Sequence, residues 1–241
     1  MSQTFISTKP IPVRERLIMA LDVPGIPEAK DLVNELDDSV LFYKVGMELF
    51  MSGNCFEFIE WLKQRQKKVF VDLKFFDVPA TVARAISALS KKGVDFATIH
   101  GNDAMLAAAA QSKNDLKVLA VTALTSLDKG DLTDLGFTCD VHELVLSRAK
   151  RALTVGCDGV VSSGLEVAMI REALDHKLLI VTPGIRPVDN QEQDDQKRVV
   201  SVESAFANGV DYIVVGRPIR DAESPKAMAE HMQTQISMLF A

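Results

Sequence analysis

The most informative segment of the sequence is Val69-Phe70-Val71-Asp72-Leu73-Lys74-Phe75-Phe76-Asp77-Val78-Pro79. It begins as an apolar run, which is typical of a strand covered on both faces. It ends in charged residues and in a proline that suits the first turn of a helix. Strand alternation places Asp72 and Lys74 on one face. If that face lines a closed site, the two charges must pair or take part in chemistry, because an isolated buried charge is costly.

The same strand–helix unit recurs along the chain. Apolar runs predict eight strands, at residues 17–22, 41–45, 69–74, 96–100, 117–122, 159–162, 178–182 and 212–216. Helical patterns lie between them. Asn54 with Glu57, and Asp140 with Glu143, are candidate capping boxes, and the last helix is expected to start at Ser224.

Eight such units in 241 residues predict a single-domain α/β protein with a (β/α)8 TIM barrel. We assign residues 17–241 to the barrel and residues 1–16 to a tail or strap. An open doubly wound sheet is the alternative. It is disfavoured because the turn after the first strand lacks the GxGxxG sequence of a dinucleotide site.

Composition excludes several classes of protein. Apolar residues make up 47% of the chain and charged residues 25%, as in ordinary globular proteins. The net charge of −6 argues against nucleic acid as a partner. The sequence shows neither a long apolar span that could cross a membrane nor a basic-then-apolar leader. The scattered cysteines Cys55, Cys139 and Cys157 suggest free thiols in a reducing compartment, so we expect a cytoplasmic protein.

Candidate site residues gather at the predicted carboxyl ends of strands, where barrels carry their function. These residues are Asp22, Lys44, Asp72, Lys74, His100, Thr125, Gly184, Arg186, Gly216 and Arg217. Lys44, Asp72, Lys74 and a nearby acid would alternate in sign, so that each charge keeps its neighbours ionised. The last four residues follow strands seven and eight, which often bind phosphate in barrels.

Two features are less clear from the residues alone. The polar stretch 187–198 has no apolar period and predicts a lid, in which Gln196 is one of several glutamines that could touch a ligand. His100 fits both a proton-transfer role and a structural role. The other histidines form no metal-ligand pattern, and no P-loop, HExxH or GxSxG motif is present.

Six blocks together resemble the bacterial form of the orotidine 5′-phosphate decarboxylase family, across about residues 17–220. They are Ala20-Leu21-Asp22, Lys44-Val45-Gly46, the run from Asp72 to Thr81, Thr182-Pro183-Gly184-Ile185-Arg186, Asp195-Gln196-Lys197-Arg198 and Val215-Gly216-Arg217-Pro218. The resemblance implies a TIM barrel that forms a homodimer with shared active sites. It also implies decarboxylation of orotidine 5′-monophosphate to UMP, the last step of pyrimidine nucleotide synthesis, without metal or organic cofactor.

The resemblance also implies roles for single residues. Lys74 would protonate C6 of the pyrimidine as carbon dioxide leaves, and Asp72 would lie against the substrate carboxylate. Asp22 and Lys44 would hold the ribose from the same chain, and Asp77 and Thr81 would bind it from the partner. Thr125 would lie beside the base, Arg186, Gly216 and Arg217 would hold the phosphate, and Gln196 would bridge base and phosphate.

Two alternatives are open. Relatives such as 3-keto-L-gulonate 6-phosphate decarboxylase and hexulose-phosphate synthase carry a similar acid–lysine–acid run. They use magnesium and are expected to have an acid on the second strand, where this chain has Lys44. A barrel that binds a nucleotide without turnover would be expected to lack Lys74 or its acidic neighbours, and all of these are present.

Overall fold

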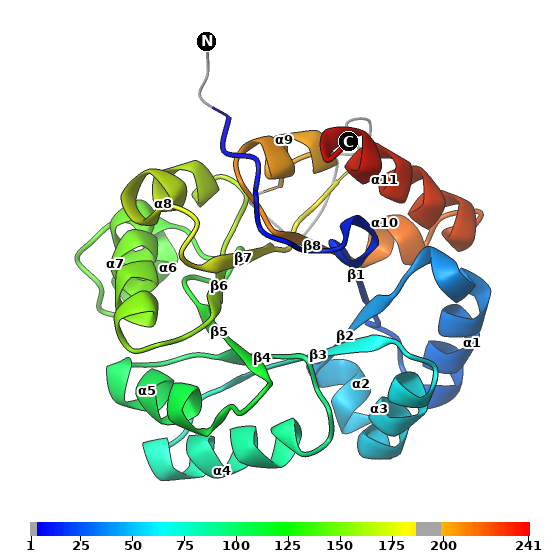
Figure 1. Cartoon of the computed structure of the whole chain (residues 1–241). Helices are drawn as coiled ribbons and strands as arrows, with labels where there is room; N and C mark the ends of the chain where they lie inside the picture. The colour runs from blue at the N-terminus through cyan, green and yellow to red at the C-terminus, as the bar shows by residue number, and fades with distance from the viewer. Residues whose placement is uncertain (1–3, 187–198) are drawn as a thin grey trace.

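Eight parallel strands close into a barrel in the order β1 to β8, and helices surround it (Figure 1). The computed structural model describes residues 4–186 and 199–241. The strands are β1 Leu17–Ala20, β2 Phe42–Gly46, β3 Lys68–Phe75, β4 Phe96–Ile99, β5 Lys117–Val121, β6 Gly159–Val161, β7 Leu179–Thr182 and β8 Tyr212–Val215. The predicted TIM barrel is confirmed, and each predicted strand is present with its ends shifted by no more than one or two residues.

Most connections between strands are helical. The α-helices are α1 Ile26–Leu36, α2 Met47–Met51, α3 Cys55–Gln64, α4 Pro79–Ser90, α5 Asp103–Ser112, α6 Lys129–Asp134, α7 Val141–Thr154, α8 Val167–Leu174, α9 Val202–Ala207, α10 Arg217–Arg220 and α11 Pro225–Leu239. Two short 3-10 helices, η1 Val13–Glu15 and η2 Asp37–Ser39, complete the described part.

The predicted helix starts are confirmed, but only one of the two predicted capping boxes is present. Asp140 and Glu143 form a reciprocal capping box on α7, and Ser224 caps α11. Pro79 is the first residue of α4. Asn54 makes no side-chain cap on α3, because its backbone is left-handed (φ 50°) whereas a capping residue is normally extended.

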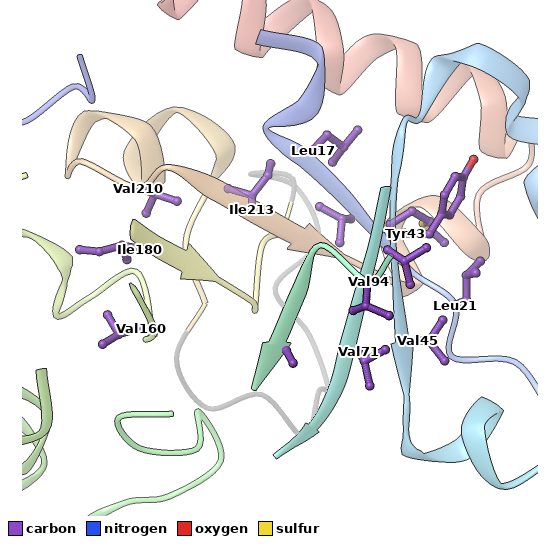
Figure 2. Packing of buried hydrophobic residues seen from close by; sticks show 14 of the residues in the cluster. Leu17, Leu21, Tyr43, Val45, Val71, Val94, Val160, Ile180, Val210 and Ile213 are labelled. Carbon is purple, nitrogen blue, oxygen red and sulfur yellow. The ribbon is translucent and has the colours of Figure 1, made fainter. Parts of the chain in front are cut away.

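Strand alternation divides the barrel residues between two apolar layers. On β1, for example, Leu17 and Met19 face the helices, whereas Ile18 and Ala20 face the interior. Figure 2 shows part of the outer layer, with buried side chains from several strands. Because the alternation continues along each strand, residues past the apolar interior point into the mouth of the barrel.

The interior of the barrel is filled by aromatic rings. Phe42 and Phe96 meet edge to face at 4.9 Å, and Phe96 and Tyr212 do so at 5.1 Å. The next inward position on β2 after Phe42 is Lys44, and it lies immediately above this apolar layer. The rings therefore close the interior of the barrel below the carboxyl ends of the strands.

The segment before β1 packs against the opposite end of the barrel. Ser7 Oγ and Lys9 Nζ donate hydrogen bonds to the carboxylate of Asp211, which also pairs with Arg171 at 2.8 Å. Both Asp211 and Arg171 have fully buried side chains. Ile11 contacts the interior cluster. These contacts cover the amino ends of β7 and β8, away from the candidate site.

Within the described part of the chain, none of the helices combines the length and apolar composition that crossing a membrane requires.

Candidate active site

A cavity of about 630 Å³ opens among the carboxyl ends of the strands. Nine of the predicted residues line it: Asp22, Lys44, Asp72, Lys74, Thr125, Gly184, Arg186, Gly216 and Arg217. They come from six different strand ends that are far apart in the sequence. Closure of the barrel is what brings them together, as expected for this fold.

Four of these side chains form a row of alternating charge, which we call the charge array: Asp22, Lys44, Asp72 and Lys74. Lys44 Nζ donates to Asp22 Oδ1 at 2.9 Å and lies 3.8 Å from Asp72 Oδ2. Lys74 Nζ donates to Asp72 Oδ1 at 3.0 Å. Each inner charge therefore has an opposite charge on either side.

Asp72 is the acid at the centre of the array. Its side chain is 15% exposed. Burial acts to raise the pKa of this carboxyl, but Lys44, Lys74 and the hydrogen bonds from Lys74 and Thr98 outweigh it, so the pKa lies below its ordinary value. Asp72 therefore stays ionised at neutral pH and keeps both ammonium groups in place.

Lys74 is aimed by an irregularity in β3. The register of pairing with β4 shifts between Val71 and Phe75, so β3 has more residues than β4 over the same stretch of the sheet. Lys74 has a left-handed backbone (φ 49°), which is uncommon for a residue other than glycine. Bulges of this kind redirect side chains next to active sites. The Lys74 side chain is 36% exposed, so a ligand in the cavity can reach its ammonium.

The far end of the cavity is cationic. Arg186 and Arg217 line it as predicted, and Arg220 is a third guanidinium that sequence reasoning missed. Arg220 Nη1 donates to the backbone oxygen of Asp22 and its guanidinium pairs with Asp221. The sequence does contain a pattern that points to Arg220, because Arg217 and Arg220 are three residues apart and so share one face of a helix.

Gly184 has a structural reason to be glycine at this end. Its φ of 74° is left-handed, where a side chain would strain the backbone. Its carbonyl accepts from Val200 N, and Arg186 N donates back to Val200 O. This pairing fixes the backbone on which Arg186 is carried.

Asp77 and Thr81, which the family resemblance implies for the site, do not line the cavity of their own chain. Asp77 is exposed, and its Oδ1 accepts from the adjacent Val78 N. Thr81 Oγ1 accepts from Arg84 on the outside of α4. The predicted network of Lys44, Asp72, Lys74 and Asp77 therefore holds within one chain only for its first three members. Gln196 and the predicted lid lie outside the described residues.

His100 lies behind the site. Arg148 Nη1 lies 3.4 Å from its Nε2, and Phe76 contacts its ring edge to face. Burial and the charges of Arg148 and Lys74 lower the pKa of His100, so its ring is neutral at neutral pH. It is not among the residues that line the cavity in the described structure.

No group of three or more His, Cys, Asp or Glu side chains within residues 4–186 and 199–241 is arranged to hold a metal ion. The cysteines in this part are unpaired, and burial is the main cause that raises the pKa of the Cys55 thiol to about 11.

The family model described as "Orotidine 5′-phosphate decarboxylase / HUMPS family" matches residues 15–232. The chain belongs to this family. A relative from Methylococcus capsulatus, named orotidine 5′-phosphate decarboxylase, is 68% identical, with 98% of each chain covered. One from Stenotrophomonas maltophilia with the same name is 49% identical over 98% of this chain and 99% of its own.

A solved member of the family has the same architecture. The crystal structure of orotidine 5′-phosphate decarboxylase from Lactobacillus acidophilus superposes with a TM-score of 0.83 at 35% identity, covering 92% of this chain and 99% of its own. The predicted family resemblance is therefore confirmed. The family model names two groups of enzymes, so the choice between them depends on the chemistry of the site.

Proposed function

We propose that this chain catalyses decarboxylation of orotidine 5′-monophosphate to UMP and carbon dioxide. The charge array carries the proposal: it places the ammonium of Lys74 3.0 Å from the largely buried carboxylate of Asp72, at the cavity mouth. The cavity has cations at one end and an apolar floor, which suits a nucleotide with a phosphate and a planar base. The high identity with relatives of that name supports the same reaction.

The proposed chemistry follows from where charge develops. When the bond between C6 and the carboxylate breaks, its electron pair stays on C6 and carbon dioxide departs. An ammonium fixed beside C6 stabilises that pair and then transfers a proton to it. Lys74 is the proton donor in this scheme. The neutral amine that results takes a proton back from solvent before the next turnover.

Asp72 has two parts in this scheme. It holds the ammonium of Lys74 in position, and it faces the substrate carboxylate with a like charge, which disfavours the bound substrate relative to the transition state. Lys44 keeps Asp72 ionised and, with Asp22, would hydrogen-bond the ribose.

Contacts between the protein and the substrate phosphate are proposed to align the pyrimidine with Lys74. Arg186, Arg217 and the backbone of Gly216 would bind the phosphate, Thr125 would lie beside the base, and Gln196 would close over both. Binding energy from a remote group can be used to orient the reacting atoms. Arg217→Ala is then expected to lower turnover of bound substrate as well as affinity.

The metal-dependent reaction on sugar phosphates is the competing function within the family. Lys44 argues against it, because its ammonium lies 2.9 Å from Asp22 and 3.8 Å from Asp72, in the place where two carboxylates would otherwise share a cation. A spectrophotometric assay tests the proposal: orotidine 5′-monophosphate mixed with the protein and a chelator should lose its orotate absorbance. Absence of turnover with tight UMP binding would indicate a binding protein instead.

We also propose a cytoplasmic homodimer in which Asp77 and Thr81 reach the partner's site. Exposed apolar side chains near the ends of β2 and β3 support an interface there, including Met51 (78% exposed) and Phe76 (66% exposed). Asp77 follows Phe76 directly, so an interface over this region would carry it toward a second chain.

Mixed dimers test the shared site. Lys74→Ala and Asp77→Ala are each expected to be inactive alone. A hybrid dimer has one site with both substitutions and one site with neither, so mixing the two variants after partial unfolding and refolding should restore activity. No recovery in a mixture that forms dimers would show that each chain uses only its own residues.

A further inference from the structure

Thr98 connects the backbone of Lys74 to the carboxylate that holds its ammonium. Thr98 lies on β4 two residues after Phe96, so it faces the barrel interior, and it is fully buried. Its Oγ1 accepts a hydrogen bond from the backbone N–H of Lys74 at 2.9 Å. The same hydroxyl donates to Asp72 Oδ1 at 2.9 Å.

The two hydrogen bonds fix the direction of the hydroxyl. A threonine hydroxyl has one proton and free acceptor lone pairs. The backbone N–H of Lys74 can only donate, so it uses an acceptor lone pair, and the single proton of Thr98 is left for Asp72. A carboxylate with a lowered pKa accepts it in ionised form. A methyl group in place of the hydroxyl could satisfy neither contact.

The contacts of Thr98 lie on the irregular part of β3. The register between β3 and β4 shifts between Val71 and Phe75, and Lys74 has φ of 49° there. Such a conformation persists only where the surroundings hold it. Thr98 supplies a contact to that backbone from the neighbouring strand.

A closed loop of contacts results. The Lys74 backbone donates to Thr98, Thr98 donates to Asp72, and Asp72 Oδ1 accepts from Lys74 Nζ at 3.0 Å. The backbone of Lys74 therefore bonds to the Thr98 hydroxyl directly, and its ammonium is linked to the same hydroxyl through Asp72. Thr98 itself is not among the residues that line the cavity in the described structure, so a bound nucleotide has no direct contact with it there.

We propose that Thr98 is a positioning residue that sets the location of the Lys74 ammonium for proton delivery. The inference rests on the proposed function. It assigns Thr98 to the chemical step and not to nucleotide binding. A shift of 1 Å at a reacting group can cost about 100-fold in rate, so loss of the hydroxyl should lower kcat by about 10- to 100-fold.

The test compares Thr98→Val, which keeps the shape, with Thr98→Ser, which keeps the hydroxyl. Thr122→Val is the matched control, because Thr122 is an equally buried threonine at the end of β5 whose hydroxyl donates to Val161 O. For each protein, kcat and the Michaelis constant for orotidine 5′-monophosphate, the dissociation constant of UMP and the melting temperature are measured.

Thr98→Val should lose kcat by about 10- to 100-fold while UMP binding stays within about threefold, and Thr98→Ser should recover most of kcat. Thr122→Val should keep kcat. The inference is overturned if Thr98→Val has wild-type kcat, if serine restores nothing, or if both valine variants lose kcat in parallel with melting temperature.

Crystal structures of the wild type and Thr98→Val separate this inference from the function. If the wild type did not consume orotidine 5′-monophosphate, the proposed function would fail, yet the positioning role would still be decided. Lys74 leaving the left-handed region, or its Nζ leaving Asp72, supports the role. An unchanged Lys74 in the variant refutes it.

Discussion

Replacing Gly46 by alanine should separate the position of the Lys44 ammonium from the stability of the barrel. Gly46 has φ of −92°, which alanine adopts without strain. An added Cβ would lie 2.9 Å from Lys44 Nζ and 3.2 Å from Asp22 Oδ1. Both atoms are at the ends of side chains, so they can move while the backbone keeps its place.

The distances set the size of the effect. Ordinary contact begins at 3.4 Å, so the ammonium must retreat by about 0.5 Å from the new Cβ. Since a misplacement of 1 Å costs about 100-fold, half that shift predicts about a tenfold loss of kcat/KM, or about 1.4 kcal/mol of transition-state stabilisation. The free energy of unfolding should change by less than about 1 kcal/mol, because alanine also restricts the unfolded chain.

The assay measures kcat/KM for orotidine 5′-monophosphate together with urea unfolding. Gly159→Ala is the control: there the Cβ would lie 2.4 Å from the backbone oxygen of Leu179, so stability should fall. Wild-type kcat/KM in Gly46→Ala, or a loss explained entirely by unfolded protein, would refute the reasoning about Lys44.

Three further predictions concern the rest of the molecule. Asp211→Asn leaves the fully buried Arg171 without its counter-charge and should cost about 3–5 kcal/mol of unfolding free energy in urea titrations; a cost below 1 kcal/mol would contradict this. The lowered pKa of His100 means that the unfolded chain binds a proton that the folded chain does not, so the free energy of unfolding should fall as pH drops below about 6.5. The fall should be smaller in His100→Gln, and the part that remains is expected from His176, whose pKa is also lowered. Thiol reagents should modify the partly exposed Cys139 in the native protein well before the two buried cysteines, as peptide mass mapping would show; equal rates would contradict the burial of those thiols.

The barrel and most of the cavity lining could be predicted from sequence because their signals are local. Each strand is a short apolar run, and each functional residue ends such a run. Asp22 and Arg217 are nearly 200 residues apart, yet both line one cavity because parallel strands in a closed barrel share a carboxyl end.

The part that could not be predicted depends on tertiary pairing. Nothing in the local sequence fixes the register shift between β3 and β4, so neither the left-handed backbone of Lys74 nor the proposed role of Thr98 follows from it. A weak signal existed, since Thr98 is a polar residue at an inward position after Phe96. In an isolated sequence, that pattern is equally consistent with a hydroxyl that bonds its own strand.

The structure of one chain does not test residues that are proposed to act in a partner's site. Asp77 and Thr81 lie outside the cavity of their own chain, and their placement in a partner's site stays a prediction. The error at Asn54 has a local cause, because a left-handed turn and a capping box share the same preference for asparagine.

The most direct measurement compares Lys74→Ala with the wild type, using orotate absorbance in the presence of a chelator and UMP binding by calorimetry. Lys91→Ala, an exposed lysine after α4 at the opposite end of the barrel, is the control. Lys74→Ala is expected to lose about 100- to 10,000-fold in turnover, as for removal of a general acid, while UMP still binds. Wild-type turnover by Lys74→Ala would contradict the claim that this ammonium delivers the proton.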